Sequence, residues 1–290
     1  MTEANAPWTI SRVIAWTAKD LHARGIESSR LDAELLVGHA LKLRRLDLYL
    51  RFDQPLDTPE LAAVRALVER RRRKEPVAYI LGVREFYGRS FTVDRRVLIP
   101  RPETEGVIEA SLALLPPPAE GVTLRALDVC AGSGCIAITL AAERPDLTVD
   151  AVELSGAAAE VARANAERLG VADRVRVLEG SLYKPLEAGA RYAVIASNPP
   201  YIPTAEVDTL MPDVSEYEPR LALDGGEDGA SILRPLFAGA RARLAEGAAI
   251  VVEIGYGQAE LARSIARDAG FTDVSVREDL AKIERVVVAR

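Results

Sequence analysis

Between residues 123 and 290, short apolar segments alternate with helical patterns, and this alternation constrains the fold more than any other feature of the sequence. The segments that we expect to be strands read LRALDV, TVDAVEL, RVRVLEG, YAVIASN and AAIVVEI. Strands that alternate with helices form a largely parallel sheet with helices packed on its faces. The sequence therefore predicts an α/β, doubly wound fold for this part of the chain.

The chain ends with two more strand patterns, DVSVRE and ERVVVAR, which are only a few residues apart. A crossover between parallel strands needs about a dozen residues or more, so we expect the last strand to run antiparallel to its neighbour. Seven strands with an antiparallel last strand are typical of the methyltransferase variant of this sheet. Sheets that bind nicotinamide cofactors are instead all parallel.

The first 75 residues carry helical patterns. In SSRLDAELLVGHALKL, apolar residues recur at helical spacing after Ser28 or Ser29, and either serine can cap the helix. In TPELAAVRALVERRRRK, we expect Thr58 to be the N-cap and Pro59 to be the first helical residue. We therefore predict a small helical domain over residues 1–84.

After Pro76 the pattern changes to short extended segments. Tyr87-Gly88-Arg89-Ser90 lies between alternating apolar residues, which is typical of a β-hairpin. A further helix is expected to begin after Glu103-Thr104-Glu105 and to end at LLPPPAEG. We predict a hairpin linker over residues 85–100 and the doubly wound domain over residues 101–290.

The composition is typical of a globular protein, because 49% of the residues are hydrophobic. No apolar run approaches the roughly eighteen residues of a membrane span, and MTEANAPWTI lacks the basic and then apolar pattern of a secretory signal. Cys130 and Cys135 lie in one turn and His22 and His39 lie far upstream, so neither a disulfide framework nor a metal site is expected. We expect a cytoplasmic protein without a metal or a membrane partner.

The net charge of −6 is unevenly distributed. Residues 1–85 hold 15 Lys and Arg against 12 Asp and Glu, a net charge of +3, which leaves −9 on the remaining residues. A doubly wound domain with this charge would repel a phosphate backbone. The charge therefore argues against nucleic acid as the direct substrate.

The strongest local motif is ALDVCAGSGCIAI, in which Asp128 ends a predicted strand and Gly132 and Gly134 permit a tight turn into a helix. Such a turn also occurs where no ligand binds. Glu153, however, ends the next strand nineteen residues later, where a carboxylate can accept hydrogen bonds from ribose hydroxyls. The pattern indicates an adenosine-type ligand.

Two cofactors fit this pattern. NAD remains possible, but the three-glycine dinucleotide pattern is missing. S-adenosylmethionine has a positive sulfonium and no phosphate, so it suits the carboxylates of Asp128 and Glu153 better. Ser181 and Leu182, after the third strand, are expected to lie beside the adenine, although an ordinary turn at a strand end would look the same.

The fourth strand ends in SNPPY, residues 197–201. The side-chain oxygen of Asn198 and the backbone carbonyl of Pro199 can accept the two N–H groups of a planar amide or amine, and Tyr201 offers a flat aromatic face. A proline-rich turn that merely ends the strand is the alternative interpretation. Adenine N6 and a glutamine amide would both fit this arrangement, and a binding protein without activity would have no need of it.

The motifs DVCAGSG and SNPPY resemble those of the amino-methyltransferases, which act on adenine N6, guanine N2 or glutamine N5. The resemblance extends to the bacterial peptide chain release factor glutamine-N5 methyltransferase family through RLDAELL, PVAYILGVREFYG, VLIPRPETE, SNPPYIP, YEPRLALDGGEDG and VVEIGYGQ. It implies methylation of the glutamine in the Gly-Gly-Gln loop of release factors, with S-adenosylmethionine as the cofactor. It also implies that the helical domain over residues 1–84 helps to grip the release factor. The ribosomal protein uL3 glutamine methyltransferases are the neighbouring alternative.

The resemblance also implies site residues. Those expected at the cofactor are Asp128, Cys130, Ala131, Gly132, Ser133, Gly134, Glu153, Ser181, Leu182 and Asn198. Those expected at the substrate are Asn198, Pro199, Pro200 and Tyr201, with catalytic roles for Asn198, Pro199 and Tyr201. Cys130 replaces a common glycine and Ser181 a common aspartate, so we expect a backbone conformation at Cys130 that a side chain tolerates and no carboxylate contact to adenine from residue 181.

Overall fold

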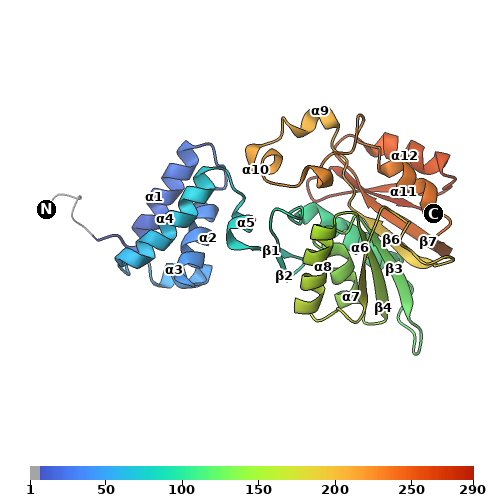
Figure 1. The fold of residues 1–290 in the computed structure, drawn as a ribbon, viewed down its shortest axis with the longest axis horizontal. Coiled ribbons are helices and arrows are strands. Elements are labelled where there is room, and N and C mark those ends of the chain that lie inside the picture. Colours follow the sequence, from blue (N-terminus) through green and yellow to red (C-terminus); the bar gives the residue numbers. More distant parts are fainter. Residues whose placement is uncertain (1–6) are drawn as a thin grey trace. The chain divides into compact units, whose positions relative to one another are not determined.

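The computed structural model describes residues 7–290 and divides the chain into two compact units (Figure 1). The helical unit comprises residues 1–82 and 212–217, and the sheet unit comprises residues 83–211 and 218–290. Residues 1–6 of the predicted helical domain lie outside the described residues. The domain boundaries drawn from the sequence at residues 84 and 100 stay predictions.

The helical unit contains short helices that pack around their own apolar core. Its core includes Ile14, Leu21, Leu36, Val37 and Leu48, which are fully buried. Its helices are α1 (Ile10–Ala23), α2 (Ser29–Leu41), α3 (Arg45–Leu50), α4 (Thr58–Arg72), α5 (Val77–Leu81) and α10 (Pro212–Ser215).

The start of α4 corrects one expectation. Its N-cap is Asp57 and not Thr58, and Thr58 is already helical. The Asp57 carboxylate accepts from the Glu60 N–H at 2.8 Å, and the Glu60 carboxylate accepts from the Asp57 N–H at 2.9 Å. This reciprocal capping box satisfies two N–H groups, whereas a threonine cap would satisfy one.

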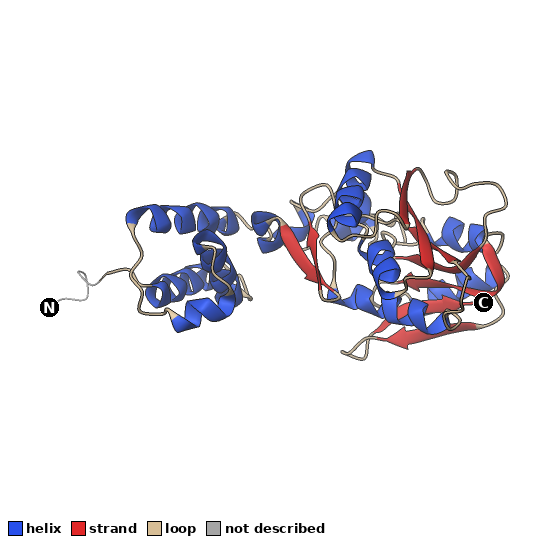
Figure 2. Ribbon diagram, turned by 90° about the horizontal axis from the view of Figure 1, so that it is seen from below, coloured by secondary structure: helices blue, strands red, loops and turns tan. Residues whose placement is uncertain are grey.

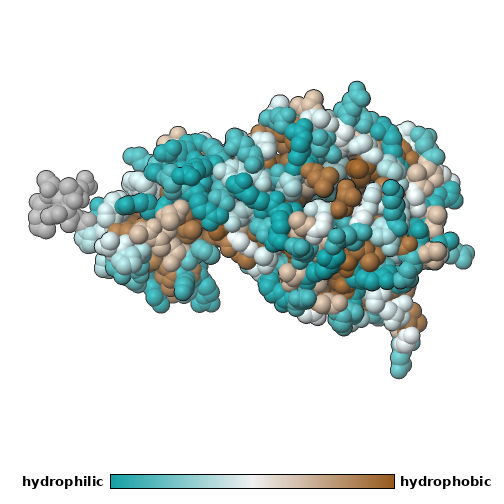
Figure 3. All heavy atoms as spheres, viewed as in Figure 1, coloured by the Kyte–Doolittle hydropathy of each residue, from teal (hydrophilic) through white to brown (hydrophobic). Residues whose placement is uncertain are grey.

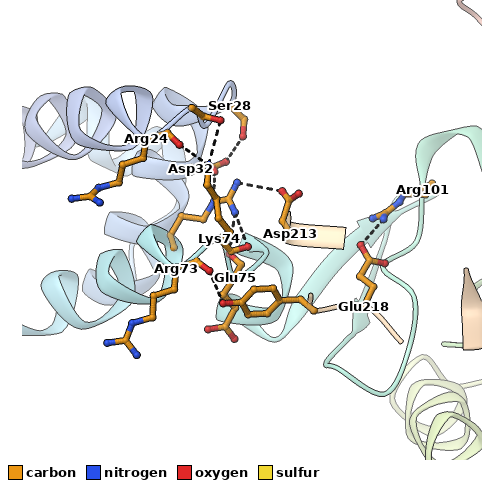
Figure 4. Close-up of polar contacts among 12 residues, drawn as sticks. Arg24, Ser28, Asp32, Arg73, Lys74, Glu75, Arg101, Asp213 and Glu218 are labelled. Atoms are coloured by element: carbon orange, nitrogen blue, oxygen red, sulfur yellow. Dashed lines mark hydrogen bonds and ion pairs between the residues drawn. The ribbon is translucent and has the colours of Figure 1, made fainter. Parts of the chain in front are cut away.

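Residues 212–217 belong to the helical unit although their chain neighbours belong to the sheet unit. Figure 4 draws polar contacts that this segment makes. Arg71 and Asp32 form a buried ion pair, with 2.8 Å between Nε and Oδ2, and Asp213 approaches the same guanidinium at 3.6 Å. The Tyr217 hydroxyl donates to the Arg73 carbonyl at 2.6 Å. Two polar contacts therefore hold this segment against α4.

The sheet unit is built around seven strands in the order β5-β4-β3-β6-β7-β9-β8. Figure 2 draws the strands in red and the helices in blue. Strand β9 pairs antiparallel with both β7 and β8, and the other neighbours are parallel, which confirms the predicted antiparallel last strand. The strands are β3 (Leu124–Val129), β4 (Leu147–Glu153), β5 (Val175–Glu179), β6 (Tyr192–Ser197), β7 (Leu244–Glu253), β8 (Val274–Glu278) and β9 (Glu284–Ala289). The predicted doubly wound sheet of seven strands is thus confirmed.

Helices follow most of the parallel strands and bury their apolar faces against the sheet. The core includes Leu127, Tyr192, Ile195, Leu236 and Phe237, all fully buried. The helical elements of this unit are η2 (Pro102–Thr104), α6 (Glu105–Leu114), α7 (Cys135–Glu143), α8 (Gly156–Arg168), α9 (Thr204–Val207), η3 (Arg220–Ala222), α11 (Leu233–Ala240) and α12 (Ala259–Asp268).

A two-stranded hairpin precedes the sheet. Strands β1 (Val83–Phe86) and β2 (Arg89–Thr92) pair antiparallel, and Tyr87 and Gly88 form the turn between them, as the sequence predicts.

Hydrophilic residues cover much of the face drawn in Figure 3, and hydrophobic residues show as separate patches. Within residues 7–290, no helix combines the length and the hydropathy that crossing a bilayer requires.

Candidate active site

A cavity of about 360 Å³ opens at the carboxyl ends of β3, β4, β5 and β6, within the sheet unit. This is the edge at which open α/β sheets bind ligands, because the loops that follow adjacent strands separate there. The sequence-predicted residues that line the cavity are Cys130, Ala131, Gly132, Ser133, Glu153, Ser181, Leu182, Asn198 and Pro200. Asp128, Gly134, Pro199 and Tyr201 are not among the described residues that line it.

The turn after β3 forms the floor of the cavity. Cys130, Gly132 and Gly134 all have a positive φ, of 63°, 54° and 80°. The value at Cys130 is the left-handed conformation that glycine favours, which costs about 1–2 kcal/mol in a residue with a Cβ. The expectation that Cys130 adopts a conformation tolerated by a side chain is therefore wrong. A Cβ at Gly134 would lie 2.9 Å from Ile138 and 3.2 Å from Ala162, so this glycine permits the close approach of α7 and α8.

Glu153, at the end of β4, fixes the shape of this turn. Its Oε2 accepts from the Gly132 N–H and its Oε1 accepts from the Ser155 N–H, each at 2.8 Å. A carboxylate oxygen has two lone pairs, so both oxygens can still accept from a ligand at the cavity wall. Glu153 is therefore a preorganised acceptor for hydroxyl groups.

Asp128 lies in the protein interior. It is fully buried, its Oδ2 accepts from the Ala137 N–H at 3.0 Å, and its Oδ1 makes no hydrogen bond with any described residue. Burial raises the pKa of its carboxyl to about 8, and the hydrogen bond from Ala137 only partly opposes this shift. The structure therefore places Asp128 where it anchors the start of α7.

Asn165 was missed by the sequence analysis. This fully buried residue of α8 accepts from the Thr92 N–H at 2.8 Å and donates to the carbonyls of Thr92 and Ser133, both at 3.0 Å. It thereby joins the hairpin to the glycine-rich turn. The one signal in the sequence is an asparagine, a poor former of helix interiors, within the alanine-rich pattern VARANAERL.

Asn198, at the end of β6, heads a chain of hydrogen bonds. Its Nδ2 donates to Thr104 Oγ1 at 3.0 Å, and Thr104 Oγ1 donates to Glu253 Oε2 at 2.6 Å. The Tyr201 hydroxyl donates to the other carboxylate oxygen, Oε1, at 3.2 Å. Thr104 and Glu253 carried no assigned role in the sequence analysis, although both stand in motifs of the family resemblance, VLIPRPETE and VVEIGYGQ.

Burial also changes the acid–base properties of this chain of hydrogen bonds. Glu253 is 1% exposed, and burial raises the pKa of its carboxyl to about 7, against the hydrogen bonds from Thr104 and Tyr201. Burial likewise raises the pKa of the Tyr201 hydroxyl, with a further contribution from the Glu253 charge. Tyr201 is therefore neutral at physiological pH.

The glycine-rich segment DGGEDG packs against the backbone of Tyr201. A Cβ at Gly225 would lie 2.8 Å from Tyr201 Cα, and one at Gly229 would overlap the Tyr201 carbonyl. That carbonyl accepts from Gln258 Nε2 at 2.8 Å. Only glycine permits this approach, so the segment fixes the path of the chain after Asn198.

Across residues 7–290, no group of three or more His, Cys, Asp and Glu side chains is arranged to hold a metal ion.

Known proteins resemble the chain over its full length. The family model described as the PrmC N-terminal domain matches residues 12–82, and the methyltransferase small domain matches residues 107–213. The release factor glutamine methyltransferase of Geobacter sulfurreducens is 46% identical over 290 residues, which cover 100% of this chain and 99% of that protein. That of Rhodopirellula baltica is 39% identical over 288 residues, covering 99% and 97%.

Solved structures share the fold over much of the chain. The hMettl16 catalytic domain in complex with a MAT2A 3′UTR hairpin aligns with a TM-score of 0.57 at 16% identity, over 80% of each chain. A methyltransferase from Pyrococcus furiosus aligns with a TM-score of 0.51 at 17% identity, over 70% of this chain and 89% of that one. The full-length identity to curated relatives decides the family: the chain belongs to the release factor glutamine methyltransferases.

Proposed function

We propose that the protein transfers a methyl group from S-adenosylmethionine to the side-chain nitrogen, N5, of the glutamine in the Gly-Gly-Gln loop of peptide chain release factors. The observation that carries the proposal is one cavity with a carboxylate, Glu153, on one wall and the Asn198 amide on another. Membership of the family supplies the class of substrate.

The cavity residues fit the proposed cofactor. Glu153 keeps lone pairs free for ribose hydroxyls, and Leu182 and Val152 provide apolar surface for an adenine ring. When bound, S-adenosylmethionine supplies a methyl group on a positively charged sulfur. Glu153 would hold the ribose, the turn from Cys130 to Gly134 would lie under the cofactor, and Ser181 and Leu182 would border the adenine.

At the substrate end, the Asn198 side-chain oxygen and the Pro199 carbonyl would accept the two N–H groups of the glutamine amide. Tyr201 would present its ring to the planar amide while its hydroxyl remains bonded to Glu253. Pro200 lines the cavity and restricts the backbone between them. Such alignment of a nucleophile can lower the barrier by roughly 7–11 kcal/mol, and the amide proton would then pass to solvent.

The rest of the chain would serve substrate recognition. The helical domain, residues 1–84, would grip the release factor, the linker would span residues 85–100, and residues 101–290 would hold the catalytic site. No nucleic acid substrate and no membrane partner are part of the proposal. Because release factors act with ribosomes, the reaction would take place in the cytoplasm.

Mass spectrometry tests this function. A release factor incubated with the protein and S-adenosylmethionine should gain the mass of one methyl group on the glutamine of its Gly-Gly-Gln loop. A release factor with that glutamine replaced by alanine is the matched control and should gain none. Transfer to ribosomal protein uL3 or to adenine in DNA, without transfer to the release factor, would contradict the proposal.

A further inference from the structure

Two buried side chains, Thr104 and Glu253, form hydrogen bonds in series with the Asn198 amide. Thr104 and Glu253 are each 1% exposed, and they connect Asn198 to the interior through hydrogen bonds of 3.0 and 2.6 Å. An asparagine amide has an acceptor end and a donor end of nearly equal shape, so its neighbours must select the orientation.

The number of protons on the Thr104 hydroxyl and the Glu253 carboxylate decides which atom donates in each of these hydrogen bonds. An ionised Glu253 carboxylate can only accept, so the single hydroxyl proton of Thr104 must be donated to it. Thr104 Oγ1 can then only accept from Asn198, which places Nδ2 beside Thr104. Oδ1 of Asn198 is left as the end of the amide that makes no hydrogen bond with any described residue.

The required orientation is the one that this chain of bonds selects. A glutamine amide nitrogen offers only donors, so its partner must present an oxygen. We propose, on the basis of the function proposed above, that Thr104 and Glu253 are positioning residues that hold the Asn198 oxygen toward the substrate amide. Glu253 does not line the cavity, and the hydroxyl of Thr104, which does line it, is engaged by Asn198 and Glu253, so both residues act through Asn198.

Protonation of Glu253 would remove the preference for one orientation of the Asn198 amide. A proton on Oε2 can be donated to Thr104, whose own proton is then free to turn toward Asn198 and stabilise the opposite orientation of the amide. The groups that influence Glu253 are the Tyr201 hydroxyl, the Glu103 carboxylate, the Cys135 thiol and the Arg285 guanidinium. Of these, Arg285 favours the ionised carboxylate and Glu103 opposes it.

Variants of Thr104 test the proposal. Thr104→Val keeps the side-chain shape without the hydroxyl, and Thr104→Ser keeps the hydroxyl. With a release factor as substrate, we expect Thr104→Val to lower kcat about tenfold, as for one lost hydrogen bond, with an unchanged Kd for S-adenosylmethionine. Thr104→Ser should recover most of kcat.

A matched control separates the loss of the Asn198 amide orientation from the general cost of removing a buried hydroxyl group. Thr139 in α7 is also fully buried, and its hydroxyl makes no hydrogen bond with any described residue. Thr139→Val should therefore leave kcat unchanged. Wild-type kcat in Thr104→Val, or equal losses in both valine variants, would overturn the proposal.

A second measurement needs no protein substrate. In protein labelled with ¹⁵N, the side-chain amide signals of Asn198, assigned through Asn198→Ala, should shift as Glu253 ionises and should not shift in Thr104→Val or Glu253→Gln. Signals that do not respond to pH in the wild type would overturn the positioning role. Failure to methylate a release factor would instead overturn the proposed function, so the two failures are distinguishable.

Discussion

The side-chain amide of Asn165 makes with Thr92 both of the backbone hydrogen bonds that a neighbouring strand would make. The same amide nitrogen also donates to the Ser133 carbonyl in the turn under the cavity. One buried side chain thus fixes the end of the hairpin and the turn together. Because the amide is fully buried, its loss leaves backbone groups without partners and without water.

We expect Asn165→Ala to lower the free energy of unfolding by about 1–3 kcal/mol, the cost of buried polar groups left unpaired. It should also weaken binding of S-adenosylmethionine, because Ser133 lines the cavity. Urea denaturation and calorimetric titration measure the two effects. Glu167→Ala, an exposed change on the same helix, is the control, and equal stability of the two variants would count against this role for Asn165.

Glu153→Gln should weaken binding of S-adenosylmethionine by about tenfold to a hundredfold. The glutamine keeps one acceptor oxygen but points an amide N–H at a backbone N–H, and hydrogen bonds to a charged group contribute about 1.5–3 kcal/mol. Glu179→Gln is the matched control, because Glu179 ends the adjacent strand and does not line the cavity. The same Kd in both variants would refute the ribose role.

Asn198→Ala should leave the Kd for S-adenosylmethionine nearly unchanged and lower turnover roughly a hundredfold or more, because an orienting group is lost. Steady-state kinetics with a release factor, combined with calorimetric titration of the cofactor, separates the two quantities. Turnover equal to that of the wild type would remove Asn198 from the catalytic site.

Stability should fall as the pH rises through the neutral range. The pKa of the Asp128 carboxyl is raised from 3.8 to about 8 in the folded protein, so the folded state binds a proton that the unfolded state has already lost. This contribution is fully present below pH 4 and is lost as the pH rises to 8. Thermal unfolding at intervals from pH 5 to 9 should therefore show a weaker pH dependence in Asp128→Asn, and an identical dependence would contradict the assignment.

Asp32→Ala should destabilise the helical unit by about 3–5 kcal/mol, since it leaves the buried Arg71 guanidinium without its nearest carboxylate. Denaturant unfolding measures this loss. Glu69→Ala removes an exposed carboxylate that pairs with Arg72 and is expected to change stability little. Similar losses in the two variants would contradict the role given to the buried pair.

The sheet was predictable because its information is local. Each of its strands is an apolar segment whose alternation with helices fixes a parallel order, and the short connection before β9 forces the antiparallel pairing. The turn after β3 and the end of β6 were also predictable, because functional residues that follow parallel strands meet at one edge of the sheet.

The residues that support the site were not predictable in this way. Thr104 and Glu253 are separated by 149 positions in the sequence, and Asn165 and Thr92 by 73, so no local pattern connects them. The N-cap at Asp57 was missed because Thr58 and Asp57 are both good caps, and only the reciprocal bond with Glu60 decides between them.

The contacts of residues 212–217 limit how the helical unit can be exchanged between related proteins. Asp213 and Tyr217 meet their partners Arg71 and Arg73 across more than a hundred residues of sequence, while Glu218, the next residue, pairs with Arg101 in the sheet unit (Figure 4). A chimera that exchanges only residues 1–82 with a relative would separate these pairs. Recombination between members of the family should therefore exchange the two segments together, so that a helical unit functions in a new protein only when it arrives with its own copy of this loop.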